Sequence, residues 1–229
     1  MSEEEISKPQ ESSPLEKLNK RISNLWFALV LAILFLAVFL FRIYWASTYR
    51  GVVVDGASMN VTLSDGDMLL MRFVDEEEKA ERGDVIVVDV KKYGFTDSKG
   101  NPIKFLIKRL IAVEHDHVRC TAGQVEIQYG GVGDWVSLQE DYAYYGSSRE
   151  SYNFGEYVVD EGEIFFLGDN RNNSKDSRYN EPQGSHLDDL YKETDIYGVV
   201  PEWAIEHRKT LEWVFFFPDK IQQWIKKEN

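Results

Sequence analysis

One long apolar segment stands near the start of the 229-residue chain. Residues 25–41 read LWFALVLAILFLAVFLF, without a single polar side chain, and Arg42 follows. A membrane-spanning helix needs about 20 mostly apolar residues. Aromatic side chains stand at both ends of the run, Trp26 before it and Tyr44 with Trp45 after it, as is typical of membrane interfaces. A buried core helix is the alternative, but this run is apolar on every face. We predict a transmembrane helix over residues 25–45.

The residues that flank this segment predict its direction. Lys17, Lys20 and Arg21 lie just before it, and basic residues favour the cytoplasmic side. A cleaved signal peptide is the competing interpretation, but the tail is long and starts with acidic residues, and no small-x-small cleavage site follows. We therefore expect an uncleaved signal anchor in the cell membrane, with residues 1–24 as a disordered cytoplasmic tail and the rest of the chain outside the cell.

Beyond the anchor, short β-branched and aromatic runs separated by Gly, Asp and Asn predict strands. Only two short helices are expected, at residues 75–81 and 219–227. The pattern predicts a mainly β domain, a sandwich or barrel, over residues 46–210. The expected strands are 52–54, 68–73, 85–90, 105–113, 125–129, 156–159 and 164–167.

Composition narrows the function. The chain has 26 Lys and Arg against 39 Asp and Glu, a formal charge of −13, which argues against nucleic acid as a partner because phosphate binding needs clustered positive charge. A single cysteine, Cys120, excludes an intramolecular disulfide framework. No Cys/His cluster has zinc-ligand spacing, so we expect neither a metal nor a cofactor.

Lys108 lies inside an apolar strand. In an alternating strand it shares a face with Leu106 and Leu110, and an ammonium group among apolar neighbours loses hydration, which lowers its pKa. A lysine that is neutral near pH 7 can act as a general base for a serine hydroxyl. A surface lysine whose stem covers apolar side chains is the other interpretation.

Ser58 is a candidate nucleophile in the segment 55–63, just past the anchor. The segment is not the Gly-x-Ser-x-Gly elbow of α/β-hydrolases, because Asn60 stands at the last glycine position. An ordinary small-residue turn is the plain alternative. A Ser-His-Asp triad stays open on composition, because the chain has His115, His117, His186 and His207.

A polar stretch at residues 168–178 follows an apolar strand. Asp176 and Arg178 are close enough in sequence for a local ion pair, and such a loop could hold Ser174 toward a lysine. A solvated surface loop is the alternative.

Together and in this order, these stretches resemble bacterial type I signal peptidases, which are membrane-bound serine proteases. The resemblance covers most of residues 25–200, and the box Gly168-Asp-Asn-Arg-x-x-Ser-x-Asp-Ser-Arg178 is its most specific part. Further matches are Gly66-Asp67, Arg82-Gly-Asp-Val85, Asn153-Phe-Gly155, Gly162, Phe165 and Asp195-Ile-Tyr-Gly198. The resemblance implies an antiparallel β-sheet or barrel catalytic domain.

Roles follow from the resemblance residue by residue. It implies that Ser58 is the nucleophile, that its backbone N–H is an oxyanion donor, and that Lys108 is the general base. It implies that Ser174 orients the lysine amine. The remaining supporting residues are Met59 beside the cleft, Asp169 and Asn170 in the polar box, and an ion pair between Asp176 and Arg178.

Three positions depart from the family pattern. Some relatives carry a hydroxyl two residues before the nucleophile, where this chain has Gly56. The family usually has proline where Val61 stands, and a Gly-x-Pro-Gly-Asp turn where this chain reads Ala112-Val-Glu-His-Asp116. We expect altered loop geometry near the site, with no reacting group removed.

The resemblance implies an endopeptidase that removes signal peptides from secretory preproteins with small residues at positions −1 and −3. A non-catalytic relative acting as an assembly factor or chaperone for surface proteins is the alternative. A self-cleaving repressor would need a DNA-binding domain in place of the span. Residues 211–229 begin with an aromatic run, 211–217, which we expect either at the lipid bilayer interface or as a final core strand.

Overall fold

A computed structural model describes residues 13–75, 78–97, 99–180 and 191–215. The chain divides into two compact units, residues 1–48 and 49–229. The boundary lies three residues past the predicted end of the anchor.

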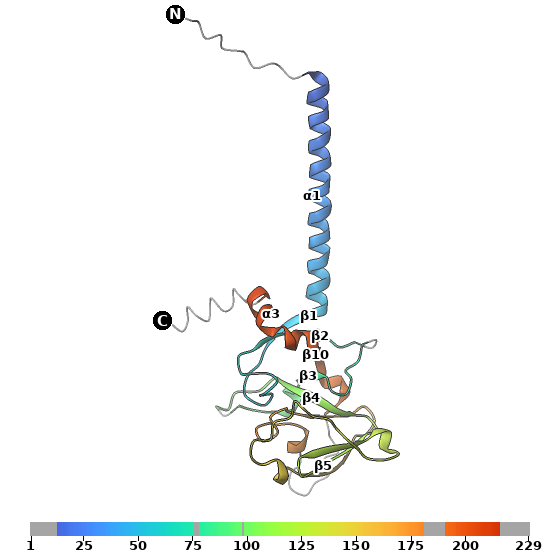
Figure 1. The fold of residues 1–229 in the computed structure, drawn as a ribbon, viewed down its shortest axis with the longest axis vertical. Helices are drawn as coiled ribbons and strands as arrows, with labels where there is room; N and C mark the ends of the chain where they lie inside the picture. The colour runs from blue at the N-terminus through green and yellow to red at the C-terminus, as the bar shows by residue number, and fades with distance from the viewer. Residues whose placement is uncertain (1–12, 76–77, 98, 181–190, 216–229) are drawn as a thin grey trace, which may run out of the picture. The chain divides into compact units, whose positions relative to one another are not determined.

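The first unit contains one α-helix, α1 (Pro14–Thr48) (Figure 1). Its length and hydropathy are sufficient for a membrane span. The helix starts earlier than expected because Ser13 and Glu16 form a capping box: the Glu16 N–H donates to Ser13 Oγ at 3.2 Å, and the Ser13 N–H donates to Glu16 Oε2 at 2.8 Å. With Pro14 at the first helical position, residues 14–24 are helical, not part of a disordered tail.

The second unit is mainly β, as predicted, and all its strand pairs are antiparallel. The larger sheet has the order β1-β2-β10-β3-β4-β9 and the smaller sheet β7-β6-β5-β8. Figure 1 labels five strands of the larger sheet and β5 of the smaller one. The larger sheet comprises β1 (Tyr49–Val53), β2 (Met68–Phe73), β10 (Ile196–Val200), β3 (Val85–Asp89), β4 (Phe105–Val113) and β9 (Ile164–Leu167); the smaller comprises β7 (Val136–Ser137), β6 (Gln124–Gln128), β5 (His117–Thr121) and β8 (Phe154–Val158).

Short helices lie between these strands or follow the last of them, β10. They are the 3-10 turns η1 (Lys91–Tyr93), η2 (Tyr129–Gly131), η3 (Arg149–Ser151), η4 (Ser177–Asn180) and η5 (Glu193–Asp195), and the α-helices α2 (Glu202–Glu206) and α3 (Arg208–Phe215). Because residues 211–215 are helical, the core-strand interpretation of this segment is wrong for that part.

The predicted helix at residues 75–81 is also wrong, since Asp75 and residues 78–81 are not helical. Its run of acidic residues has no apolar face to pack against the protein, and packing supplies most helix stability in proteins. The second expected helix, at residues 219–227, lies outside the described residues.

Strands β4 and β9 are buried on both faces. Ile111 and Phe165 face a core shared with the smaller sheet, while Leu110 and Phe166 belong to a second cluster with Ile86 of β3. These two strands therefore connect the two cores, and β4 carries Lys108 into the interior.

Candidate active site

Ser58 lies in the loop between β1 and β2. The Gly56 N–H donates to Asp65 Oδ1 at 2.7 Å, with Gly56 in the left-handed region (φ +92°), which favours glycine. The Leu63 N–H donates to the Met59 carbonyl at 2.8 Å, and both side chains are buried. The loop therefore packs firmly beneath Ser58, whose side chain lines a cleft.

Lys108 approaches Ser58 from β4. Its Nζ lies 2.7 Å from Ser58 Oγ and 2.8 Å from the Ile107 carbonyl oxygen, and the residue is only 2% exposed. Burial lowers the pKa of Lys108 to about 8, against the opposing effect of Asp176 and Asp169. A substantial fraction of the amine is therefore neutral just above pH 7.

The polar box after β9 holds the nucleophile loop in place. The Asn170 N–H donates to the Ser58 carbonyl at 3.0 Å, and Asn170 Nδ2 donates to the Ala57 carbonyl at 3.0 Å. Asp169 accepts a hydrogen bond from Thr62 Oγ1 at 2.5 Å. These contacts attach both ends of the segment 57–62 to the polar box.

Asp176 and Arg178 form the expected ion pair, with Arg178 Nε 2.7 Å from Asp176 Oδ1. The Gly168 N–H also donates to Asp176 Oδ2 at 3.1 Å. The pair therefore fixes the start of the box as well as placing a negative charge near Lys108.

Ser174 is buried against Gly168. A Cβ placed on Gly168 would lie 2.2 Å from Ser174 Oγ and 2.6 Å from the Ser58 carbonyl oxygen. Ser174 and the nucleophile therefore meet on one side of Gly168. Within the described residues the Ser174 hydroxyl has no hydrogen-bond partner, so its expected role in orienting the lysine amine stays a prediction.

The cleft beside Ser58 has a volume of about 620 Å³. Its walls come from β1, from Ile103 and from residues 105–108, although β1 and β4 are separated by three strands in the sheet order. The larger sheet therefore curls around the cleft. Met59, Met71 and Leu106 are among its apolar lining residues.

Other sequence candidates lie away from this cleft. Neither His115, His117 nor His207 lines it, and His117 Nδ1 instead lies 2.6 Å from Glu156 Oε1; His186 lies outside the described residues. Among the described residues, no group of three or more His, Cys, Asp and Glu side chains could hold a metal ion.

Arg109 was not singled out from the sequence. It holds Asp169 through two hydrogen bonds, of 2.9 and 2.6 Å. Its position directly after Lys108, on the opposite strand face, was the available signal.

Comparison with known proteins identifies the family of this chain. The model of a family described as signal peptidase, peptidase S26, matches residues 24–213. The chain belongs to this family. A signal peptidase I of Bacillus licheniformis is 31% identical over 168 residues, which cover 71% of this chain and 83% of that protein. Signal peptidase I U of Bacillus subtilis is 31% identical over 153 residues, covering 65% of this chain and 75% of that protein.

Among solved structures, a signal peptidase I from Enterococcus faecalis is 25% identical, with a TM-score of 0.37, and the match covers 54% of this chain and 97% of that chain. Family membership together with the apolar helix α1 indicates a membrane-anchored serine peptidase.

The departures from the signal peptidase pattern leave the site assembled. Val61 is exposed, at 67%. In the 112–116 turn, His115 occupies the glycine position with φ +70°, and Asp116 is retained. Asp116 is fully buried and accepts hydrogen bonds from Arg82 Nε and Nη2, of 2.6 and 2.8 Å.

Gly56, the third departure, offers no hydroxyl to an oxyanion. Within the described residues the Ser58 backbone N–H makes no hydrogen bond. Its expected role as an oxyanion donor stays a prediction.

Proposed function

We propose that this signal peptidase family member removes signal peptides from exported preproteins, with Ser58 as nucleophile and neutral Lys108 as general base. The observation that carries the proposal is the 2.7 Å contact between Lys108 Nζ and Ser58 Oγ, formed by a buried amine of lowered pKa at the edge of a cleft. The reaction, removal of a signal peptide, is inferred from the relatives, which are named signal peptidase I. A non-catalytic relative would have no need of this pair.

The chemistry runs in two halves. The neutral amine takes the Ser58 proton as Oγ attacks the substrate carbonyl, and the resulting ammonium protonates the leaving amine, so that the mature protein departs and an acyl-enzyme remains. The same amine then deprotonates a water molecule, which attacks the ester carbonyl. The bond from that carbon to Ser58 Oγ breaks, the lysine ammonium returns the proton to Oγ, and the signal peptide leaves with a free carboxyl group. The Ser58 backbone N–H donates to the tetrahedral oxyanion. Because Gly56 adds no hydroxyl, a second donor must come from elsewhere in the cleft or from water.

The sheet edges favour an extended substrate. Strand β9 pairs with Arg109–Val113 of β4, so within the described residues the edge of residues 105–108 that faces away from β3 has no strand partner. The outer edge of β1 also has no strand partner in the part of the chain that the structure describes. A preprotein segment can therefore add to these edges by backbone hydrogen bonding. Small side chains at −1 and −3 would face the apolar wall that includes Val54, Met71 and Leu106.

Membrane attachment by residues 25–45 would keep the enzyme where signal peptides emerge. The basic residues 17–21 favour a cytoplasmic N-terminus, which leaves residues 46–210 as an extracytoplasmic peptidase domain. We also propose that the aromatic segment starting at residue 211 contacts the headgroup region. Trp213 of α3 is 70% exposed, and tryptophan favours that layer.

The test is cleavage of a preprotein with an Ala-x-Ala site by the detergent-solubilised full chain. Ser58→Ala and Lys108→Met should each abolish cleavage. The matched controls are Ser137→Ala and Lys104→Met, both at exposed positions of the same domain, and both should cleave normally. Cleavage that survives Lys108→Met would overturn the assignment of the base. Failure of a folded parent to cleave would overturn the function.

A further inference from the structure

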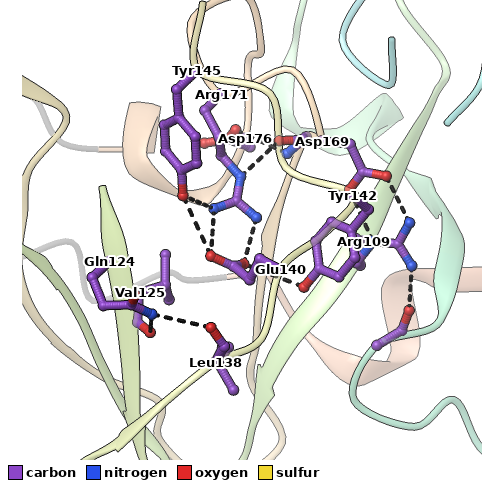
Figure 2. Close-up of polar contacts among 12 residues, drawn as sticks. Arg109, Gln124, Val125, Leu138, Glu140, Tyr142, Tyr145, Asp169, Arg171 and Asp176 are labelled. Atoms are coloured by element: carbon purple, nitrogen blue, oxygen red, sulfur yellow. Dashed lines mark hydrogen bonds and ion pairs between the residues drawn. The ribbon is translucent and has the colours of Figure 1, made fainter. Parts of the chain in front are cut away.

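A buried ion pair lies between the smaller sheet and the polar box. The Arg171 side chain is fully buried and that of Glu140 is 4% exposed, and Arg171 Nη2 lies 2.6 Å from Glu140 Oε1. Arg171 Nη1 also donates to Glu140 Oε2 and to the Tyr145 hydroxyl, at 3.1 and 3.0 Å. Figure 2 shows the guanidinium group enclosed by these two side chains. A buried carboxylate needs such a partner, so each group fixes the other.

The ion pair is connected to the start of the polar box by a hydrogen bond to Gly168. Arg171 Nε donates to the Gly168 carbonyl at 3.1 Å. The backbone repeats the attachment, because the Arg171 N–H donates to the Tyr144 carbonyl at 2.9 Å and the Tyr144 N–H donates to the Asp169 carbonyl at 2.8 Å. Residues 168–171 are therefore held by the segment 138–145, which follows β7.

Gly168 in turn touches the proposed catalytic pair. A Cβ added to Gly168 would overlap Ser174 Oγ and would lie 2.6 Å from the Ser58 carbonyl oxygen. Gly168 therefore lies close to both residues, and a displacement of its backbone toward them would push on Ser58 or Ser174.

The same segment also contacts the strand that carries the lysine. The guanidinium of Arg109 lies 3.9 Å from the centre of the Tyr142 ring, and the Tyr142 hydroxyl donates to Glu140 Oε1 at 3.2 Å. One carboxylate thus connects to Arg171 directly and to Arg109 through Tyr142, as Figure 2 shows.

We propose that Glu140 is a positioning residue for the Ser58–Lys108 pair. Its carboxylate holds Arg171 on the Gly168 carbonyl and Tyr142 on Arg109, so the segment 138–145 sets the distance between the two reacting groups. This inference rests on the proposed function. Nothing in the family match or in the names of the relatives assigns Glu140 a role.

The experiment reads the geometry of the pair without substrate. In a Ser58→Cys variant of the full chain, a nearby Lys108 ammonium stabilises the thiolate, and alkylation by iodoacetamide at neutral pH follows the thiolate fraction. The other thiol, Cys120, interferes little, since it is buried and burial raises its pKa to about 11. Adding Lys108→Met should slow alkylation roughly tenfold, as the thiol pKa returns to about 8.5.

Adding Glu140→Gln to Ser58→Cys should slow alkylation by about threefold or more, because the displaced thiol pairs less well with the ammonium. The matched control is Glu163→Gln, which removes another buried carboxylate, the one paired with Lys192, and should leave the rate unchanged. In the Ser58 enzyme, Glu140→Gln should lower kcat and leave KM unchanged.

The outcomes separate the two proposals. An unchanged alkylation rate in folded Glu140→Gln would overturn the positioning role alone. If Lys108→Met does not change the alkylation rate of the Ser58→Cys variant, the catalytic pair is overturned, and the positioning role of Glu140 with it. If Glu140→Gln does not fold, Tyr145→Phe replaces it, since it removes only the hydroxyl that accepts from Arg171 Nη1 and donates to Glu140 Oε2. It should slow alkylation by about twofold, and an unchanged rate would overturn the positioning role.

Discussion

Replacing Lys108 with methionine should stabilise the fold at neutral pH while abolishing activity. Burial lowers the pKa of Lys108 from 10.5 to about 8, whereas in the unfolded chain the amine is hydrated and keeps its ordinary pKa. Below pH 8 the folded protein therefore carries a charge in an apolar site. A shift of this size corresponds to about 3 kcal/mol of lost stability.

The sign follows from proton binding. Between about pH 8 and about pH 10.5 the unfolded chain binds more protons than the folded chain, so the parent gains stability as pH rises through this window. Methionine does not titrate, and it loses the contacts of Nζ with Ser58 Oγ and the Ile107 carbonyl, which are worth about 1 kcal/mol in total. Lys108→Met should thus be about 2 kcal/mol more stable than the parent at pH 7, and about 1 kcal/mol less stable above pH 10.5.

The assay is thermal unfolding of the detergent-solubilised chain, followed by tryptophan fluorescence across this pH range. At pH 7 the midpoint should rise by about 4–8 °C, and the difference should change sign near pH 10. Lys104→Met, at an exposed position close to Lys108, should show neither effect. A Lys108→Met variant that is less stable than the parent at pH 7, or a difference that does not depend on pH, would refute the reasoning.

Three further predictions follow from particular contacts. His115→Gly should raise the free energy of unfolding by about 1 kcal/mol, because His115 is exposed in a left-handed conformation (φ +70°); an unchanged midpoint in thermal unfolding would contradict this. Gly168→Ala should abolish preprotein cleavage, because its methyl group would overlap Ser174 and the Ser58 carbonyl, while Gly155→Ala, with open space around it, should cleave normally. Replacement of all four histidines by glutamine should leave cleavage intact. Loss of activity in a folded variant would instead indicate that a histidine is the general base.

Much of the fold could be predicted from hydrophobic alternation. The predicted strands at 68–73, 105–113 and 164–167 match β2, β4 and β9. Strand β5 was missed because Val118 is its only β-branched apolar residue, whereas β6 has two, Val125 and Ile127, at alternate positions. Strand β10 was missed because Gly198 interrupts it. That glycine is required, since a Cβ there would lie 2.6 Å from the Arg72 carbonyl oxygen.

The site was less accessible to sequence patterns. The ion pair of Asp176 and Arg178 is local, and so it could be predicted. Ser58 and Lys108 are 50 residues apart, and their pairing was predicted only through the family resemblance. Glu140 had no signal, because its partner Arg171 is 31 residues away and on a different element. Such pairs depend on how the two sheets pack, which no local pattern encodes.

The central claim is that neutral Lys108 activates Ser58, and the pH dependence of kcat/KM for preprotein cleavage tests it most directly. With the pKa of Lys108 at about 8, the neutral fraction rises about tenfold between pH 7 and pH 9, and kcat/KM should rise with it. The same acidic limb should persist when the histidines are replaced. A rate that is flat from about pH 6 to about pH 10, or a limb that disappears with a histidine, would contradict the account.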